Sequence, residues 1–174
     1  HCSCSAPSHP ALSCQSAEPA PEVRENTLRV RVLSYNIRHG EGMDGEFDLQ
    51  RLADVILESR ADYVLLQEVD EGTHRAGHVH QAREIAALCG MRPFFGAAMD
   101  YDHGQYGEAL LYGRSPVVLR NHALPHEPEH EPRAAVEGIV RKAGEPLFRV
   151  VGTHLDHTRD SKSRRDQARA LTAL

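Results

Sequence analysis

Tryptophan is absent from the 174 residues, and aromatic residues make up only 5% of them. Because exposed aromatic rings are the platforms on which single-stranded nucleic acids stack, this composition argues against such a surface. The formal net charge of −5 argues against a broad basic face for duplex DNA, although it allows a local basic pocket for one phosphate. No apolar run approaches the roughly 18 residues that a transmembrane helix needs.

Cysteine is scarce in the body of the chain. Cys2, Cys4 and Cys14 lie in the first 14 residues and Cys89 lies far from them, which excludes a disulfide framework for a domain. Residues 1–26 are rich in Ser, Pro and Ala and predict a disordered leader or linker, with the ordered domain at 27–174. The leader favours a secreted or periplasmic protein, with a cytoplasmic location as the alternative. The sequence leaves the oligomeric state open.

Hydrophobic periodicity predicts a mixed domain of the α+β class, rich in strands. Strands are expected at residues 28–35, 63–67, 93–98, 108–112, 117–120, 134–142 and 147–153, with a turn at 143–146 joining the last two. A helix is expected after Asp48, its N-cap, and a second one at 79–89, with Leu88 facing inward and Gly90 as its stop. Ser163 and Asp166 predict a capping box for a last helix.

Two polar residues each end an apolar strand. Asn36 ends the first strand and Glu68 ends the second, with a helical stretch between them. Parallel strands joined through a helix bring both strand ends to one edge of a sheet, where α/β folds bind ligands. A carboxylate there can hold Mg²⁺ by one oxygen, and an amide can orient it. The alternative is a turn Asn and a surface Glu.

A second polar group is the stretch 153–157, Thr-His-Leu-Asp-His. If the strand persists, alternation places His154, Asp156 and Thr158 on one face and His157 on the other. A His at a strand end can donate a hydrogen bond to a phosphate oxygen and stabilise developing charge. The alternatives are a polar loop, or a zinc site from His154 and His157, which the short spacing supports weakly.

Arginines beside loops form a third group. Arg75, Arg114 and Arg133 suit bidentate phosphate recognition, and the alternative for each is a solvated surface position. Residues 104–107 (Gly-Gln-Tyr-Gly) predict a flexible segment that places Tyr106 near a strand start, where core packing is its ordinary role.

Taken in order, these segments resemble the endonuclease/exonuclease/phosphatase superfamily of DNase I-like metal-dependent hydrolases. The resemblance covers the chain from about residue 28 to its end, and no single motif decides it. The run 67–75, with Thr73 and Arg75, looks most like the bacterial metal-dependent hydrolase branch. The matching segments are 33–37 (Leu-Ser-Tyr-Asn-Ile), 66–70 (Leu-Gln-Glu-Val-Asp), 106–111 (Tyr-Gly-Glu-Ala-Leu-Leu) with 114–116 (Arg-Ser-Pro), 132–134 (Pro-Arg-Ala), 153–157, and Arg164 with Gln167.

The resemblance implies a DNase I-like four-layer α/β sandwich, with two sheets face to face and helices outside. It also implies that Asn36 and Glu68 belong to the metal and active-site cluster and that His154 contacts the scissile phosphate. Arg133 matches a position near the site, and with His157 and Arg75 it is expected to bind substrate. The expected cation is Mg²⁺, with Mn²⁺ or Ca²⁺ as alternatives.

The chain also departs from the family pattern. Glu108 stands where Asn or a small residue is usual, and Tyr112 with Gly113 stands where a Ser usually precedes the family's Arg. The later Gly-Asp-x-Asn and Ser-Asp-His motifs have no counterpart, so the chain is expected to hold roughly the first two-thirds of such a domain. We therefore expect these 174 residues alone to be weakly active or inactive and prone to aggregate. Mg²⁺-dependent hydrolysis that Glu68→Ala abolishes would contradict this expectation.

The sequence therefore predicts a metal-dependent hydrolase of phosphoester bonds, acting as a phosphodiesterase, nuclease or phosphatase. The alternative is a non-catalytic relative that binds phosphate ligands or proteins. Nucleic acid remains among the expected substrates but is not favoured, because of the acidic charge and the few aromatic residues.

Overall fold

The structure is a computed structural model and describes residues 29–113, 116, 118–141 and 146–174. The predicted leader, Arg114 and most of the predicted turn at 143–146 lie outside these residues. The helices and strands, in chain order, are β1 (Val32–Asn36), the 3₁₀ turn η1 (Arg38–Gly40), α1 (Leu49–Ser59), β2 (Tyr63–Glu71), α2 (Gln81–Cys89), β3 (Arg92–Tyr101), β4 (Gly104–Tyr112), β5 (Val118–Leu124), β6 (Arg133–Val140), β7 (Phe148–Thr153) and α3 (Lys162–Thr172).

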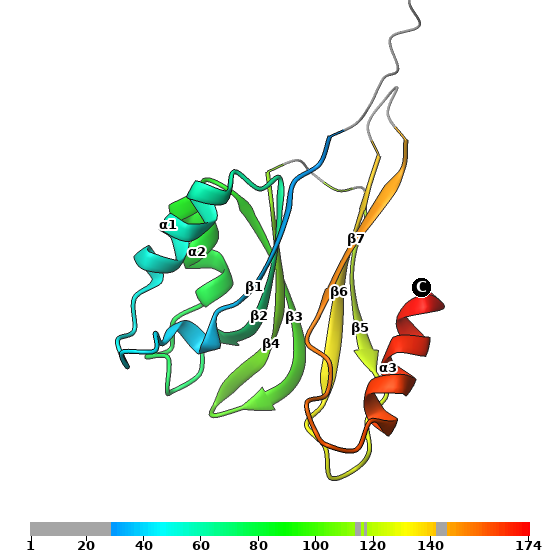
Figure 1. Ribbon diagram of the computed structural model, residues 1–174. Helices are drawn as coiled ribbons and strands as arrows, with labels where there is room; N and C mark the ends of the chain where they lie inside the picture. The colour runs from blue at the N-terminus through cyan, green and yellow to red at the C-terminus, as the bar shows by residue number, and fades with distance from the viewer. Residues whose placement is uncertain (1–28, 114–115, 117, 142–145) are drawn as a thin grey trace, which may run out of the picture.

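The strands form two stacked sheets. The first has the order β1-β2-β4-β3, with β1 and β2 parallel and the other pairs antiparallel, and the second has the antiparallel order β5-β6-β7. Helices α1 and α2 cover the outer face of the first sheet, and α3 lies outside the second (Figure 1). This arrangement of helices, sheet, sheet and helix confirms the predicted four layers.

Strand β2 supplies side chains to both hydrophobic cores, because successive strand residues point to opposite faces. Val64 and Leu66 pack in the core under α1 and α2, whereas Tyr63 and Leu65 pack in the core between the sheets. A strand covered on both faces needs a continuous apolar run, and the run that begins at Tyr63 meets that need. The second core packs the two sheets against each other and thereby sets how far apart their edges lie.

Two of the predicted helix boundaries are confirmed. The Asp48 carboxylate accepts hydrogen bonds from the backbone N–H groups of Gln50 and Arg51 at 2.9 and 3.2 Å, so it caps α1. Gly90 ends α2 with φ +65°, a left-handed conformation that glycine adopts without strain. The structure describes no helix that is long and apolar enough to cross a membrane.

Three local predictions were wrong. Helix α3 begins at Lys162, so Ser163 lies inside the helix and is buried instead of capping it, and Asp166 pairs with Lys162 and Arg169. Leu88 is 42% exposed, because the apolar stripe of α2 runs through Ala82, Ile85 and Ala86. Residues 104–107 are not a flexible segment, since they form the first half of β4.

Candidate active site

Asn36 ends β1, and its side chain contacts that of Glu68. Glu68 was predicted to end the second strand, but it lies within β2, which continues to Glu71. The two strands pair in parallel, with Asn36 opposite Gln67, so both side chains reach the same edge of the first sheet. The Asn36 side-chain amide donates a hydrogen bond to Glu68 Oε1 over 2.7 Å, and its own oxygen accepts one from the Arg38 backbone N–H at 2.9 Å. Asn36 therefore fixes the orientation of the Glu68 carboxylate.

The backbone at Glu68 is strained. The register of β2 against β4 shifts between Leu66 and Val69, so Gln67 and Glu68 form a β-bulge, and Glu68 has φ +58°. A left-handed conformation costs a residue other than glycine on the order of 1 kcal/mol, and bulges next to active sites turn side chains in a new direction. Here the bulge turns the Glu68 carboxylate toward the second sheet.

The second sheet brings a cationic group and two imidazoles to the same edge. Arg133 begins β6 and is buried, and its guanidinium nitrogens lie 3.3 Å from His154 Nδ1 and 3.2 Å from His157 Nδ1. A guanidinium can only donate hydrogen bonds, so both Nδ1 atoms accept. The proton of each neutral ring is therefore on Nε2, which makes Nε2–H the hydrogen-bond donor that each imidazole can offer.

The predicted alternation across residues 153–157 was wrong. Strand β7 ends at Thr153, and His154 and His157 share one guanidinium instead of facing opposite sides. Asp156 is buried and accepts hydrogen bonds from the backbone N–H and the hydroxyl of Thr158. Its carboxylate supports the loop between β7 and α3 and does not face the same edge as the imidazoles.

The two sheets meet at the contact between Glu68 and His154. His154 Nδ1 lies 3.8 Å from Glu68 Oε1, and both side chains are about one-quarter exposed. Burial and the neighbouring Arg133 lower the pKa of His154, while the nearby Glu68 carboxylate opposes that shift. The His154 ring is therefore neutral at pH 7 and carries the Nε2–H donor described above.

Glu108, on β4, lies under this contact and is only 1% exposed. Burial raises its pKa to about 8, and the nearby Glu68 charge adds to the shift, while Arg133 and the His154 backbone N–H oppose it. At pH 7 the Glu108 carboxyl group is therefore protonated. Sequence reasoning noted Glu108 only as a departure from the family; the available signal was a carboxylate directly before the apolar run that starts at Ala109.

Arg75 lies near Glu68 and lines the same small cavity. Its guanidinium makes two bonds to the fully buried Asp70 carboxylate, at 2.7 and 2.8 Å, and its Cζ lies 4.5 Å from the centre of the Tyr101 ring. Tyr106 lines this cavity as well. The structure thus brings Arg75 beside the predicted site, with two of its N–H groups already bound to Asp70.

The same hydrogen-bond pattern supports the backbone next to Glu68 and next to His154, and it was not predicted from the sequence. Two positions after Glu68, the backbone N–H of Asp70 donates to the side-chain oxygen of Gln81 on α2. Two positions after His154, the backbone N–H of Asp156 donates to the side-chain oxygen of Gln167 on α3, over the same distance of 2.9 Å. In each case the Gln follows the Asp by eleven residues.

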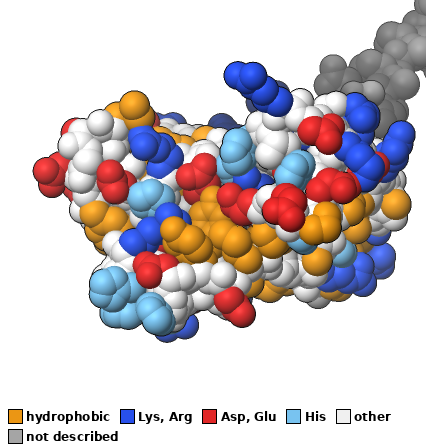
Figure 2. All heavy atoms as spheres, turned by 90° about the horizontal axis from the view of Figure 1, so that it is seen from below, with side chains coloured by type: hydrophobic (Ala, Val, Ile, Leu, Met, Phe, Trp, Pro, Cys, Tyr) orange, Lys and Arg blue, Asp and Glu red, His pale blue; other side chains and the backbone are white. Residues whose placement is uncertain are grey.

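The charges at this edge are mixed. Figure 2 shows the molecule from below, where acidic and histidine side chains gather around a band of hydrophobic atoms. In the part of the chain that the structure describes, no three His, Cys, Asp or Glu side chains form a metal-binding group. A cation here would therefore have a single carboxylate, Glu68, as its main protein ligand, together with amide oxygen and water.

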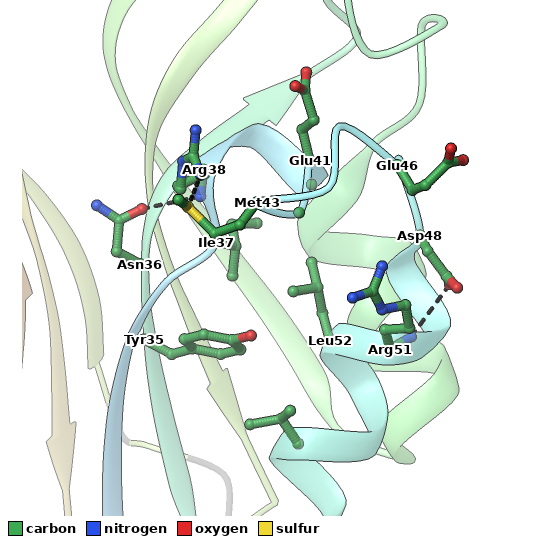
Figure 3. A pocket seen from close by; sticks show the side chains of 13 residues that line it. Tyr35, Asn36, Ile37, Arg38, Glu41, Met43, Glu46, Asp48, Arg51 and Leu52 are labelled. Carbon is green, nitrogen blue, oxygen red and sulfur yellow. Dashed lines mark hydrogen bonds between the residues drawn. The ribbon is translucent and has the colours of Figure 1, made fainter.

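A separate cavity of about 410 Å³ lies between η1 and α1 (Figure 3). Tyr35 and Leu52 line it, and Figure 3 shows the Asn36 side chain turned away from both of them. This cavity is therefore on the helix side of β1 and does not contain the contact between Glu68 and His154.

The fold and this edge define a class of protein: a two-sheet α/β sandwich whose sheets jointly present a carboxylate, an amide, an arginine and two histidines. The model of the Endonuclease/Exonuclease/phosphatase family matches residues 33–174, and the chain belongs to this family. Its superfamily consists of phosphoester hydrolases and nucleases, which commonly use divalent metals.

Solved structures with the same fold include an endonuclease/exonuclease/phosphatase from Beutenbergia cavernae, with 23% identity and a TM-score of 0.66 over 83% of this chain and 43% of that one. A family protein from Leptotrichia buccalis has 12% identity and a TM-score of 0.56 over 72% of this chain and 53% of that one. D. rerio TDP2, complexed with single strand DNA product, has 18% identity and a TM-score of 0.58 over 83% of this chain and 53% of that one. The chain spans about half the length of these structures.

Proposed function

We propose that the protein is a metal-dependent hydrolase of phosphoester bonds and that Asn36, Glu68 and His154 are its catalytic residues. The observation that carries this proposal is the 3.8 Å approach of His154 Nδ1 to a Glu68 carboxylate that Asn36 holds. It combines an anionic ligand for a cation with a neutral imidazole whose Nε2–H can donate to phosphate. Phosphoryl transfer needs mainly these two functions, positioning and charge stabilisation.

The donor set of the site fits Mg²⁺. This ion keeps several waters and needs only one or two carboxylates besides substrate phosphate, so Glu68 alone suffices as the charged ligand. Asn36 Oδ1 accepts one hydrogen bond and keeps a second lone pair for the ion. Mn²⁺ or Ca²⁺ could use the same oxygens. A bound cation would supply charge neutralisation on the phosphoryl oxygens.

The remaining site residues serve substrate binding in this proposal. His154 donates Nε2–H to a non-bridging phosphate oxygen, and His157 presents a second donor of the same tautomer. Arg133 holds both rings and adds positive charge beneath the phosphate, while Arg75, bound to Asp70, lines the neighbouring wall. The protonated Glu108 adds no negative charge at pH 7, so the phosphate meets fewer repelling carboxylates than the sequence suggests.

The substrate is a phosphoester whose class is open among nucleic acid, lipid and small molecules. The net charge of −5 does not favour DNA, although a TDP2 of the same fold has been solved with a DNA product. The polar composition of residues 1–26 supports a secreted or periplasmic location, which cell fractionation can test.

The experiment is a hydrolysis panel on the complete natural protein, with DNA, a lipid phosphodiester and a phosphomonoester, with Mg²⁺ or with EDTA. We expect turnover of at least one substrate that EDTA and Glu68→Gln both abolish. The matched control is Glu58→Gln, which changes an exposed glutamate on α1. Saturable Mg²⁺-dependent binding without turnover would contradict the enzyme and support the non-catalytic alternative.

A further inference from the structure

Beside Glu68 lies a cavity of about 130 Å³ that the catalytic proposal does not use. Glu68 forms one wall, so the cavity adjoins the proposed phosphate position. Its other walls include Arg75, Met99, Tyr101 and Tyr106. A group attached to that phosphate would therefore lie next to the cavity.

Two bulges shape this cavity. One is the bulge at Glu68 in β2, and the other is a register shift in β3 between Ala97 and Met99, which places Met99 opposite Tyr106. Both neighbours of β4 thus bend away at the same level of the sheet. At this level the backbones of β3 and β4 also lie close together at Gly107, where a Cβ would collide with the carbonyl oxygen of Gly96.

The cavity walls combine two aromatic rings with an arginine that is already paired inside the protein. Arg75 is held by two bonds to Asp70, which cancels its charge locally, and its Cζ lies 4.5 Å from the Tyr101 ring centre and 5.6 Å from that of Tyr106. Thr73 also donates to the Asp70 carboxylate at 2.7 Å, so the guanidinium has a fixed support. The wall therefore consists of a fixed guanidinium and two rings whose planes are tilted by 55° to each other.

We propose that this cavity binds one planar, uncharged ring in the ester arm of the phosphoester that the Glu68 centre cleaves. The proposal rests on the proposed function and names the class of substrate. Its size fits, since a cavity of about 150 Å³ is known to hold benzene. Aromatic, methionine and guanidinium groups attract the faces and edges of planar rings. Arg75 in its lining is already paired with Asp70, so its guanidinium is not left to attract a second anionic group.

The test compares three probes that differ by one feature each: phenyl phosphate, methyl phosphate and phenol. Each is titrated into the complete natural protein with Mg²⁺, and the Met99 methyl signal is followed by NMR. We expect phenyl phosphate to bind about fivefold to tenfold more tightly than methyl phosphate and to shift the Met99 signal, as phenol also does. Tyr101→Ala should remove this preference, whereas Tyr101→Phe, which keeps the ring, should retain it.

The outcomes separate this inference from the proposed function. Equal affinities for the two phosphates, without a Met99 shift, would overturn the ring site and leave the phosphate site standing. A Met99 shift with phenol but no binding of either phosphate would support the ring site and contradict the phosphate site. A preference for phenyl phosphate that survives Tyr101→Ala would overturn the assignment to this cavity.

Discussion

The two sheets present their functional residues through matching supports. On β2, Glu68 precedes a buried Asp70 by two positions, and on the loop after β7, His154 precedes a buried Asp156 by two positions. Each Asp backbone is held by a glutamine on the next helix, as described above. The partners of the two carboxylates differ: the Arg75 guanidinium binds Asp70, whereas Asp156 Oδ2 lies 3.1 Å from His130 Nδ1.

This comparison separates residues that act from residues that support. Asp70, Asp156, Gln81 and Gln167 are buried and have partners inside the protein, whereas Glu68 and His154 are about one-quarter exposed. The cluster of His130, Asp156 and Ser163 contains the three residue types of a hydrolase triad. However, Ser163 Oγ and Asp156 Oδ2 both lie on the same ring atom, His130 Nδ1, so no proton relay runs through that ring.

The largest effect should come from Glu68→Gln. The change removes the carboxylate that is proposed to bind the cation, so we expect kcat/KM of the complete protein to fall about 10³-fold or more. The thermal midpoint should change little, because Glu68 is only partly buried and its backbone strain is unaffected. A fall in activity that follows a loss of folded protein would instead make Glu68 a supporting residue.

Removing either buried aspartate should destabilise the fold. Asp70→Ala leaves Arg75 without its partner, and Asp156→Ala leaves His130 and Thr158 without theirs, so each should lower the free energy of unfolding by about 3 kcal/mol. Urea denaturation measures both values. A large loss for one aspartate and none for the other would show that the two supports are not equivalent.

The glutamines test the same comparison more narrowly. Gln81→Ala and Gln167→Ala each remove the acceptor of a buried backbone N–H, and Gln167 also donates to the Pro125 carbonyl oxygen at 3.1 Å. We expect each variant to lose about 2 kcal/mol of stability. Amide hydrogen exchange should speed up at Asp70 in the first variant and at Asp156 in the second. Gln50→Ala, an exposed change on α1, is the control.

Glu108 makes stability depend on pH. Its pKa is raised from 4.5 in the unfolded chain to about 8, so the folded state keeps a proton that the unfolded state releases between these values. Stability from this group is therefore present below pH 4.5 and is lost as the pH rises toward 8. Without metal, Glu108→Gln should flatten this slope and stabilise the protein at pH 8 by about 2 kcal/mol, because its amide avoids the cost of burying a charge. The measurement is the free energy of unfolding against pH for both proteins. Equal slopes for the natural protein and Glu108→Gln would contradict the raised pKa of Glu108.

The smallest effect concerns Arg133. Arg133→Lys keeps the charge but loses the planar pair of donors that reaches both Nδ1 atoms, so we expect roughly tenfold weaker phosphate binding. The direct measurement is ¹⁵N NMR of the histidine rings, which should show Nε2–H for His154 and His157 in the natural protein and a mixture of tautomers in the variant. Unchanged tautomers would show that Arg133 does not set them.

Local patterns allowed the sequence to predict much of the scaffold. The cap at Asp48, the stop at Gly90 and the strand from Tyr63 depend on nearby residues, and all three are present. The sequence-based prediction failed where contacts with residues far along the chain set the position of a side chain. Ser163 reads as a cap, but burial against the loop at Glu127 and His130 places it inside α3, where its hydroxyl meets both residues.

The sequence by itself determined the strand end at Asn36 and the family motifs, because these depend on local order along the chain. Only the tertiary structure decided what those residues meet. The bulge at Glu68 arises from the pairing of β2 with β4, and the guanidinium shared by His154 and His157 from the pairing of β6 with β7. The protonated state of Glu108 arises from its burial. Strand pairing and burial join residues far apart in the chain, so no local pattern contains these features.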